Sequence, residues 1–297
     1  MREAVTETNS AKAEHLLLLG TKLLRERIEK DSDKEIHYHS LIEKQLDFAK
    51  RSSLSEEQRL NILEEAEADL CRAKQHYPNS SDITTLAAKL NIELSQIPNA
   101  EMLLLRSVKL DGANTRARVL LARMYIHDGR LPEALTLVDA GLEHDPNSYG
   151  LLRLRLDCLR KLHRPWNDIR LAIGKYLNVA EGDFEERLKF IKGLVEASDI
   201  AHAKRQLEIL KKADLAYNLR SRTEFDLRIN GSPMTVEGTY SASGLAKGYV
   251  QIDGYPAGMG AYLDIRAISS GTKLFSGKRV RISLAVNGFG LKTRQLL

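Results

Sequence analysis

The sequence predicts a multidomain protein in which an all-α helical-repeat solenoid is followed by a small all-β barrel. Two observations lead to this fold class. Ala66, Ala100 and Ala134 follow one another at a spacing of 34 residues, which indicates an internal repeat. Near Ala216 the helical spacing of apolar residues ends, and short alternating runs separated by glycines begin, as in strands.

The repeat extends to the residues around each alanine. Four residues later come Leu70, Leu104 and Val138, and seven residues later come the small residues Ala73, Ser107 and Gly141. This pattern resembles the tetratricopeptide repeat, a helix-turn-helix unit that buries its apolar face only by stacking on its neighbours. The best copy, residues 115–147, has Leu121, Ala122 and Tyr125 on its first helix and Asp128-Gly129 at the turn. Small residues at the close contacts let paired helices approach each other.

The other copies match this pattern less completely. Residues 35–50 are longer and more polar than a standard first helix, and residues 149–179 keep the helical spacing without the small and aromatic positions. A last pair consists of a first helix over 184–197 and a second helix with Ala203, Leu207 and Leu210. We therefore expect a repeat domain over residues 1–216.

The repeat resemblance implies a protein partner. First helices line the concave groove of such a stack, so Arg118, Tyr125 and Arg153 are the candidate groove residues. The two arginines favour an acidic peptide.

The C-terminal part is predicted to be all-β. Phe225, Leu227 and Ile229 alternate with polar residues, and Asn230-Gly231 is a hairpin signal. We expect a linker with a first β segment over 217–236 and a barrel domain over 237–297. This length suits a five-stranded barrel of the OB type.

The net positive charge is confined to this β part. From Tyr217 to Leu297 there are 11 basic and 5 acidic side chains, a balance of +6, whereas residues 1–216 carry a net −1. A small basic barrel is typical of proteins that contact phosphates. The alternative is that these charges only make the surface soluble and bind no partner.

The run from Gly238 to Ile252 resembles the opening of a cold-shock domain, including Lys247-Gly248-Tyr249, and Tyr262-Leu263-Asp264-Ile265 resembles its second motif. Such domains hold single-stranded RNA or DNA by stacking bases on aromatic rings above a basic surface. The resemblance implies a nucleic-acid site made by Lys247, Tyr249, Tyr262, Arg266, Lys278, Arg279 and Arg281. Ala242, Ser243 and Gln251 occupy three positions where the family has stacking groups, and Asp264 replaces a histidine, so charge is expected to carry more of the binding than stacking.

No pattern of catalytic residues stands out, and we expect neither enzymatic activity nor a cofactor nor a metal. His37 and His39 are predicted to be exposed polar residues on different faces of a helix. Cys71 and Cys158 occupy apolar-looking helix positions and are predicted to be buried reduced thiols. The leucines at 16–19 lie in an amphipathic helix flanked by charges and not in a signal peptide, which predicts a cytoplasmic protein without a membrane anchor.

Two functions stay open at this point. The first is an adaptor whose repeats hold a protein and whose barrel contacts single-stranded nucleic acid. The second is a pure protein-interaction or sensor module, such as the C-terminal part of a larger signalling or antiviral (anti-phage) defence NTPase, because helical repeats followed by an OB-like barrel resemble the ends of such proteins.

Overall fold

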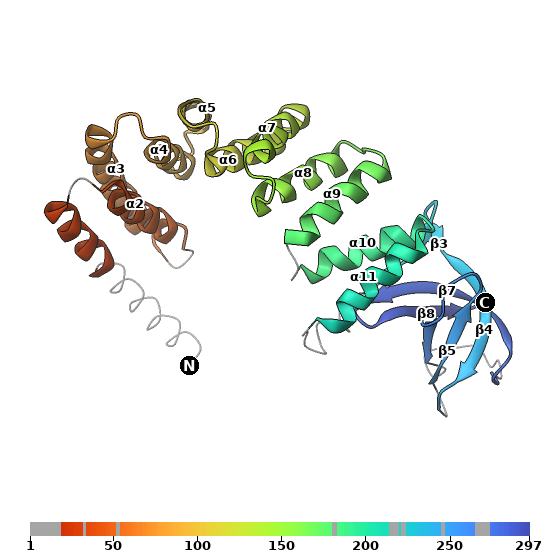
Figure 1. Ribbon diagram of the computed structural model, residues 1–297. Helices are drawn as coiled ribbons and strands as arrows, with labels where there is room; N and C mark the ends of the chain where they lie inside the picture. Colours follow the sequence, from red (N-terminus) through yellow and green to blue (C-terminus); the bar gives the residue numbers. More distant parts are fainter. Residues whose placement is uncertain are drawn as a thin grey trace. The chain divides into compact units, whose positions relative to one another are not determined.

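The computed structural model describes residues 19–31, 34–51, 54–179, 183–213, 220, 224–244, 247–264 and 274–297 (Figure 1). Their contacts divide the chain into two compact units, Met1–Ala172 and Ile173–Leu297. Each unit is described by itself below. Arg266, one of the predicted nucleic-acid contacts, lies outside the described residues.

The helical part is a series of helix pairs, preceded by helical residues 19–30. Its helices are α2 (Glu35–Ala49), α3 (Glu56–His76), α4 (Ser81–Glu93), α5 (Ile97–Leu110), α6 (Thr115–His127), α7 (Leu131–His144), α8 (Tyr149–Lys161), α9 (Trp166–Val179), α10 (Phe184–Glu196) and α11 (Ile200–Lys212). The first helices α4, α6 and α8 begin at Ser81, Thr115 and Tyr149, a spacing of 34 residues. The predicted repeat is therefore confirmed.

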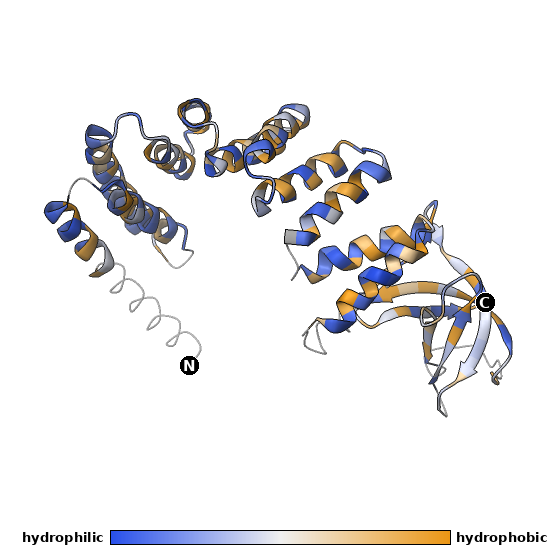
Figure 2. Cartoon of the chain, in the orientation of Figure 1, coloured by the Kyte–Doolittle hydropathy of each residue, from blue (hydrophilic) through white to orange (hydrophobic). Residues whose placement is uncertain are grey.

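The apolar faces of neighbouring helices in the first unit form overlapping cores. Ala66, Ala100 and Ala134, the residues that revealed the period, are completely buried. Hydrophobic and hydrophilic residues alternate around the helices, as on α8 (Figure 2). Cys158 belongs to the core around α4 to α7, where burial raises the pKa of its thiol to about 11. Cys71 is exposed, so the prediction of a buried thiol is wrong at that position.

The turns within four helix pairs share one backbone conformation. Ser95, Gly129, His163 and Ser198 each have a positive φ, between 50° and 77°. This left-handed conformation closes the first helix of each pair, as when the N–H of Gln96 donates to the carbonyl oxygen of Asn91 over 2.8 Å. Of these four residues, Gly129 alone adopts the conformation without a Cβ penalty.

The C-terminal strands form a closed barrel of the OB type. The strands are β1 (Glu224–Asp226), β2 (Arg228–Ile229), β3 (Ser232–Pro233), β4 (Thr235–Ala242), β5 (Lys247–Ile252), β6 (Ala261–Asp264), β7 (Arg279–Asn287) and β8 (Gly290–Leu296). The sheet order is β1-β7-β4-β5-β6-β8, and an additional β7–β8 pairing closes it. All pairings among the described strands are antiparallel except that between β6 and β8.

Two local sequence signals of the β part have clear structural reasons. Asn230 and Gly231 both have positive φ and join β2 to β3, so the predicted hairpin is confirmed. Gly248 lies beneath the ring of Tyr240, where a Cβ atom would come within 2.3 Å of Cε2. The glycine of the Lys-Gly-Tyr sequence is thus required for packing.

The last helices belong to the same compact unit as the barrel. A Cβ atom on Gly288, in the β7–β8 turn, would lie 2.9 Å from Cζ of Phe184 on α10. The backbone N–H of Arg228 donates to Glu196 on α10 over 2.6 Å. This unit begins at Ile173, within α9, whereas the change from helix to strand lies between Lys212 and Glu224.

None of the helices in the described residues combines the length and the apolar character that a membrane span requires.

The close approach at Gly288 gives a first testable prediction. Gly288→Ala is expected to lower the free energy of unfolding of the second unit by about 1–3 kcal/mol, because the added methyl group overlaps the Phe184 ring and the Arg220 backbone. Gly244→Ala is the matched control, since its Cβ would meet nothing within 4 Å. Hydrogen exchange of barrel amides measures both variants, and equal stabilities would contradict the packing argument.

Candidate nucleic-acid interface and repeat groove

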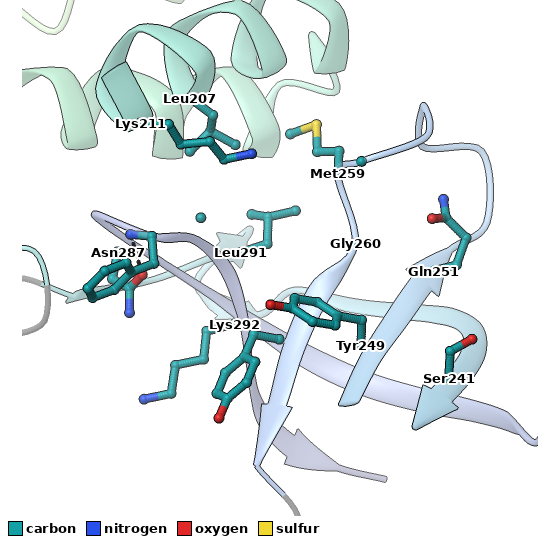
Figure 3. Close-up of a pocket in the computed structure, with 14 residues that line it drawn as sticks. Leu207, Lys211, Ser241, Tyr249, Gln251, Met259, Gly260, Asn287, Leu291 and Lys292 are labelled. Carbon is teal, nitrogen blue, oxygen red and sulfur yellow. Dashed lines mark hydrogen bonds between the residues drawn. The ribbon is translucent and has the colours of Figure 1, made fainter. Parts of the chain in front are cut away.

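A cavity of about 770 Å³ lies in the second unit between α11 and the outer surface of the barrel (Figure 3). Its walls come from α11, from strands β4, β5, β6 and β8, from the β5–β6 connection and from the β7–β8 turn. The residues that line it are Leu207, Lys211, Ser241, Tyr249, Gln251, Gly258, Met259, Gly260, Tyr262, Asn287, Phe289, Gly290, Leu291 and Lys292.

Two tyrosines predicted from the sequence meet in this cavity. Along β5, Gly248 and Val250 face the barrel interior, so Tyr249 between them faces outward and is 51% exposed. Tyr249 lies directly opposite Tyr262 on β6. Their rings are in edge contact, with centroids 5.7 Å apart and an interplanar angle of 67°. The two rings together form an aromatic surface on the outer face of β5 and β6.

A third ring comes from the β7–β8 turn. Phe289 is 45% exposed, and its backbone N–H donates to Oδ1 of Asn287 over 2.9 Å, which fixes the turn. Lys292 on β8 lies opposite Tyr262 in the parallel pairing. Aromatic and basic side chains from three connected strands and one turn are therefore gathered on one surface.

The lysines of the cavity have acidic neighbours. Nζ of Lys292 lies 3.0 Å from Oε2 of Glu224, and Nζ of Lys211 lies 3.3 Å from Oε1 of Glu208. The Lys211–Glu208 pair is exposed and worth about 0–1 kcal/mol, so a phosphate can compete with Glu208 for the ammonium group of Lys211. Glu224 is largely buried and also lies 2.9 Å from Nη1 of Arg294.

Sequence reasoning missed most of the cavity wall. Leu207 and Lys211 belong to a helix that the sequence assigns to the repeats, and nothing in the spacing places it over the barrel. Phe289 and Lys292 had a usable signal, because both are close to Gly288 and Gly290, which mark a turn in the sequence.

The predicted basic residues are distributed differently from Tyr249 and Tyr262. Lys247 is exposed and lies opposite Asp264. Arg279 makes a two-point contact with Asp253 and lies 3.6 Å from Glu237, and the hydrogen bonds from Arg279 hold the pKa of Asp253 below its ordinary value.

Arg281 and Lys278 complete the predicted set. Arg281 is exposed, with Nη2 3.4 Å from Oγ1 of Thr235, and Lys278 has its Nζ 5.9 Å from the Phe275 ring centroid. None of the predicted basic residues that the structure describes lines the cavity itself.

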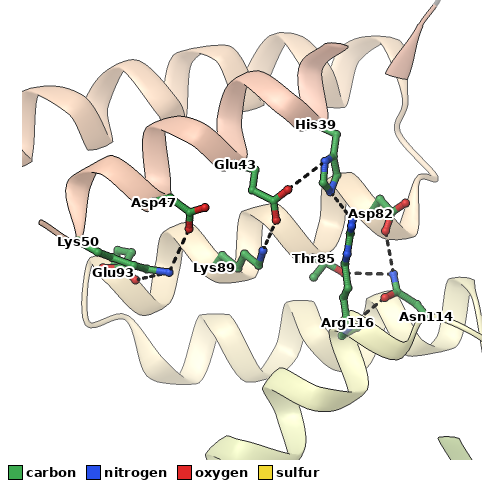
Figure 4. Close-up of polar contacts among 11 residues, drawn as sticks. His39, Glu43, Asp47, Lys50, Asp82, Thr85, Lys89, Glu93, Asn114 and Arg116 are labelled. Atoms are coloured by element: carbon green, nitrogen blue, oxygen red, sulfur yellow. Dashed lines mark hydrogen bonds and ion pairs between the residues drawn. The ribbon is translucent and has the colours of Figure 1, made fainter. Parts of the chain in front are cut away.

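In the first unit, polar side chains of three first helices are joined across one face (Figure 4). Nη1 of Arg116 on α6 lies 2.8 Å from Nε2 of His39 on α2, and Lys89 on α4 donates to Glu43 on α2 over 2.8 Å. His39 is only 8% exposed, so its prediction as an exposed residue is wrong. Residues 77 positions apart thus share this face, which we call the repeat groove.

Glu43 is the acidic residue at the middle of the repeat groove. Burial raises the pKa of its carboxyl, but the hydrogen bond from Lys89 and the charges of Lys89, His39 and Arg116 outweigh burial and lower that pKa below its ordinary value. Ionised Glu43 therefore stabilises the folded chain above the unfolded-state pKa, and this contribution is lost as the pH falls through the folded value.

Arg118, predicted to contact a peptide, points into the stack. It is 7% exposed and donates two hydrogen bonds to the carbonyl oxygen of Gly112, over 2.8 and 3.0 Å, and one to Leu137 over 3.4 Å. Gly141 makes room for it, because a Cβ there would lie 2.9 Å from Cδ of Arg118. The residue therefore ties α6 to α7.

The other groove candidates differ from Arg118. Tyr125 is buried, with the guanidinium carbon of Arg130 3.9 Å above its ring centroid. Arg153 on α8 is exposed. On α6, Arg116 and Arg123 reach the surface.

Within the described residues, no three side chains of His, Cys, Asp or Glu gather as a metal site.

Comparison with known proteins matches residues 92–155, from the end of α4 into α8, to the family model described as tetratricopeptide repeat. This agrees with the repeat read from the sequence. No curated protein sequence matches the chain significantly.

Several solved structures are similar over about two thirds of the chain. TTC0263, a thermophilic TPR protein of Thermus thermophilus, is 11% identical, with a TM-score of 0.45 over 63% of this chain and 95% of that protein. YrrB, a TPR protein with an unusual peptide-binding site, is 12% identical, with a TM-score of 0.42 over 63% of this chain and 89% of that protein. A human IFIT1 dimer with m7Gppp-AAAA is 14% identical, with a TM-score of 0.43 over 66% of this chain and 46% of the IFIT1 chain.

The burial of Arg118 gives a second prediction. Arg118→Ala is expected to reduce the free energy of unfolding by about 2–4 kcal/mol, because it leaves the carbonyl of Gly112 without its donor and opens a cavity. Arg123→Ala, on the surface of the same helix, should change it by no more than about 0.5 kcal/mol. Urea unfolding followed by circular dichroism measures both. If the Arg118→Ala protein has unchanged stability, the packing role of Arg118 is contradicted and its prediction as a groove contact is favoured instead.

Proposed function

We propose that the protein is a non-enzymatic cytoplasmic adaptor in which the helical repeats hold a protein partner and the barrel contacts single-stranded RNA or DNA. The observation that carries the nucleic-acid part is the pair Tyr249 and Tyr262, in edge contact on the outer surface of β5 and β6 beside Phe289 and Lys292. Stacking of one base on an aromatic side chain is worth about 1–3 kcal/mol and tolerates any base.

The position of these rings on the barrel supports the proposal. In an OB-type barrel, oligonucleotides bind to the second and third strands and to the loop between the fourth and fifth. Counting the closed barrel from β4, Tyr249 and Tyr262 lie on the second and third strands, and Phe289 lies in the connection between the fourth and fifth.

The charge of the barrel supports weak, salt-dependent binding. Arg279 and Lys292 are engaged by carboxylates, whereas Lys247 and Arg281 have no ion-pair partner among the described residues. The electrostatic contribution is therefore smaller than the +6 balance suggests. Stacking carries a correspondingly larger share than the sequence alone led us to expect.

The repeat groove favours an acidic peptide. Arg116 and Arg123 on α6 and Arg153 on α8 reach the surface of first helices, and Lys89 borders the same face. Glu43 already binds Lys89, and His39 already contacts Arg116. A carboxylate of a bound peptide therefore has to displace one of these internal partners. This competition limits the affinity for acidic peptides, and the basic side chains of the groove reject basic peptides.

A binding assay tests the nucleic-acid proposal. Fluorescence anisotropy of the full chain with a labelled single strand should show affinity that falls with salt, with a log-log slope of about −0.7 for each neutralised phosphate. Tyr249→Ala should weaken binding by about 1–3 kcal/mol without changing the slope. The control is Tyr149→Ala, a tyrosine of nearly equal exposure (50%) on α8.

The result that contradicts this proposal is the absence of measurable binding at low salt. The barrel would then be a protein-contact module, as in the sensor alternative.

A second assay tests the peptide proposal. Reversing Arg116 and Arg123 to glutamate should weaken binding of acidic peptides about tenfold or more, because like charges then face the ligand. Reversal of Lys74 and Lys109, exposed on the second helices α3 and α5, changes the net charge equally and should have little effect. A peptide array with acidic and basic sets measures both, and equal losses would place the peptide elsewhere.

A further inference from the structure

The cavity beside α11 has walls that differ from an open strand-binding surface. Tyr249 lies on one side, and Leu207 of α11 and Met259 of the β5–β6 connection lie across from it (Figure 3). Tyr262 also lines the cavity and contacts the ring of Tyr249. A flat aromatic ligand between these sides contacts the Tyr249 ring on one face and apolar side chains on the other. This enclosure suits a nucleobase.

The cavity is closed on the side of α11. Nζ of Lys204 on that helix donates to the carbonyl oxygen of Ala257 over 2.9 Å, which ties α11 to the connection that carries Met259. A strand that follows β5 and β6 toward the helix therefore meets a wall. At about 770 Å³, the volume falls in the range of pockets for single small molecules and not of a channel for a continuous strand.

The polar groups of the cavity suit an additional negative charge. Lys211 and Lys292 come from opposite sides, and each has a carboxylate as its present partner. A terminal phosphate carries about −1.5 to −2 charges at neutral pH, compared with about −1 for an internal phosphodiester. It therefore competes better with Glu208 for the ammonium group of Lys211.

We infer that this cavity binds the terminal nucleotide of a single strand, with its base between Tyr249 and Met259 and its terminal phosphate near Lys211. The inference rests on the proposed function, and it makes the protein a reader of strand ends. Internal nucleotides then lie on the open part of the β5–β6 surface.

The test compares a linear oligonucleotide with a circular one of the same sequence and length, using anisotropy competition against the full chain. The linear strand with a terminal phosphate should bind at least about fivefold more tightly than the circle, since only it has an end to place in the cavity. Separate 5′-phosphate, 3′-phosphate and hydroxyl-ended strands identify the end that is bound. Equal affinities of linear and circular strands would overturn the inference while leaving the proposed function intact, and no binding of either would overturn both.

Two substitutions locate the effect. Lys211→Glu should remove most of the preference for a phosphorylated end, whereas Lys212→Glu, the next residue and outside the cavity, should retain it at the same net charge. Met259→Trp fills the cavity and should abolish the preference of linear over circular strands. Circular dichroism confirms that each variant is folded, and a preference that survives both Lys211→Glu and Met259→Trp would contradict the assignment of the cavity.

Discussion

The close approach of the β7–β8 turn to α10 is the constraint on which the rest of the second unit depends. Gly288 is the residue that permits it, since the Phe184 ring and the Arg220 backbone leave no room for a side chain. The same turn carries Phe289 and Asn287, and the helix pair held against it supplies Leu207 and Lys211. Barrel and helices therefore make the cavity together, and neither element has this site alone. In agreement with this, α10 and α11 belong to the same compact unit as the barrel, which begins at Ile173.

The helical part could be predicted in register from spacing alone, because small residues at 34-residue intervals have a direct packing reason. Residue roles were harder to predict. Arg118 shares the helical stripe of Leu121, Ala122 and Tyr125, which marks it as inward-facing, yet its charge argues for solvent. Its burial depends on the carbonyls of Gly112 and Leu137, whose orientation only the folded turn and the neighbouring helix determine. His39 was misjudged for the same reason, because its partner Arg116 is 77 positions away.

For the barrel, the resemblance to a cold-shock domain was enough to assign Tyr249 and Tyr262 to one predicted site, and the pairing of β5 with β6 puts them side by side. Net charge was a weaker guide. Arg279 counts toward the basic balance, but pairing between β4 and β7 brings it beside Glu237, and the β5–β6 connection brings Asp253 to it. Charges that neutralise one another in space are counted separately in a sequence. The wall provided by α11 had no sequence signal, since it depends on how a repeat-like helix packs against strands that follow it.

The left-handed turns of the repeats have a consequence for how the stack opens. In a quasi-one-dimensional array, each pair contributes its own intrinsic stability and its interfaces with the neighbours. Ser95 and His163 adopt a conformation that costs a residue with a Cβ about 1–2 kcal/mol, whereas Gly129 adopts it freely. The turn of the pair α6–α7 therefore carries less backbone strain than the turns of the other two pairs, and this pair has neighbours on both sides. Local unfolding should therefore begin in the flanking helix pairs and proceed toward α6–α7. The amide hydrogens of α6–α7 should then be the last of the three pairs to exchange with solvent.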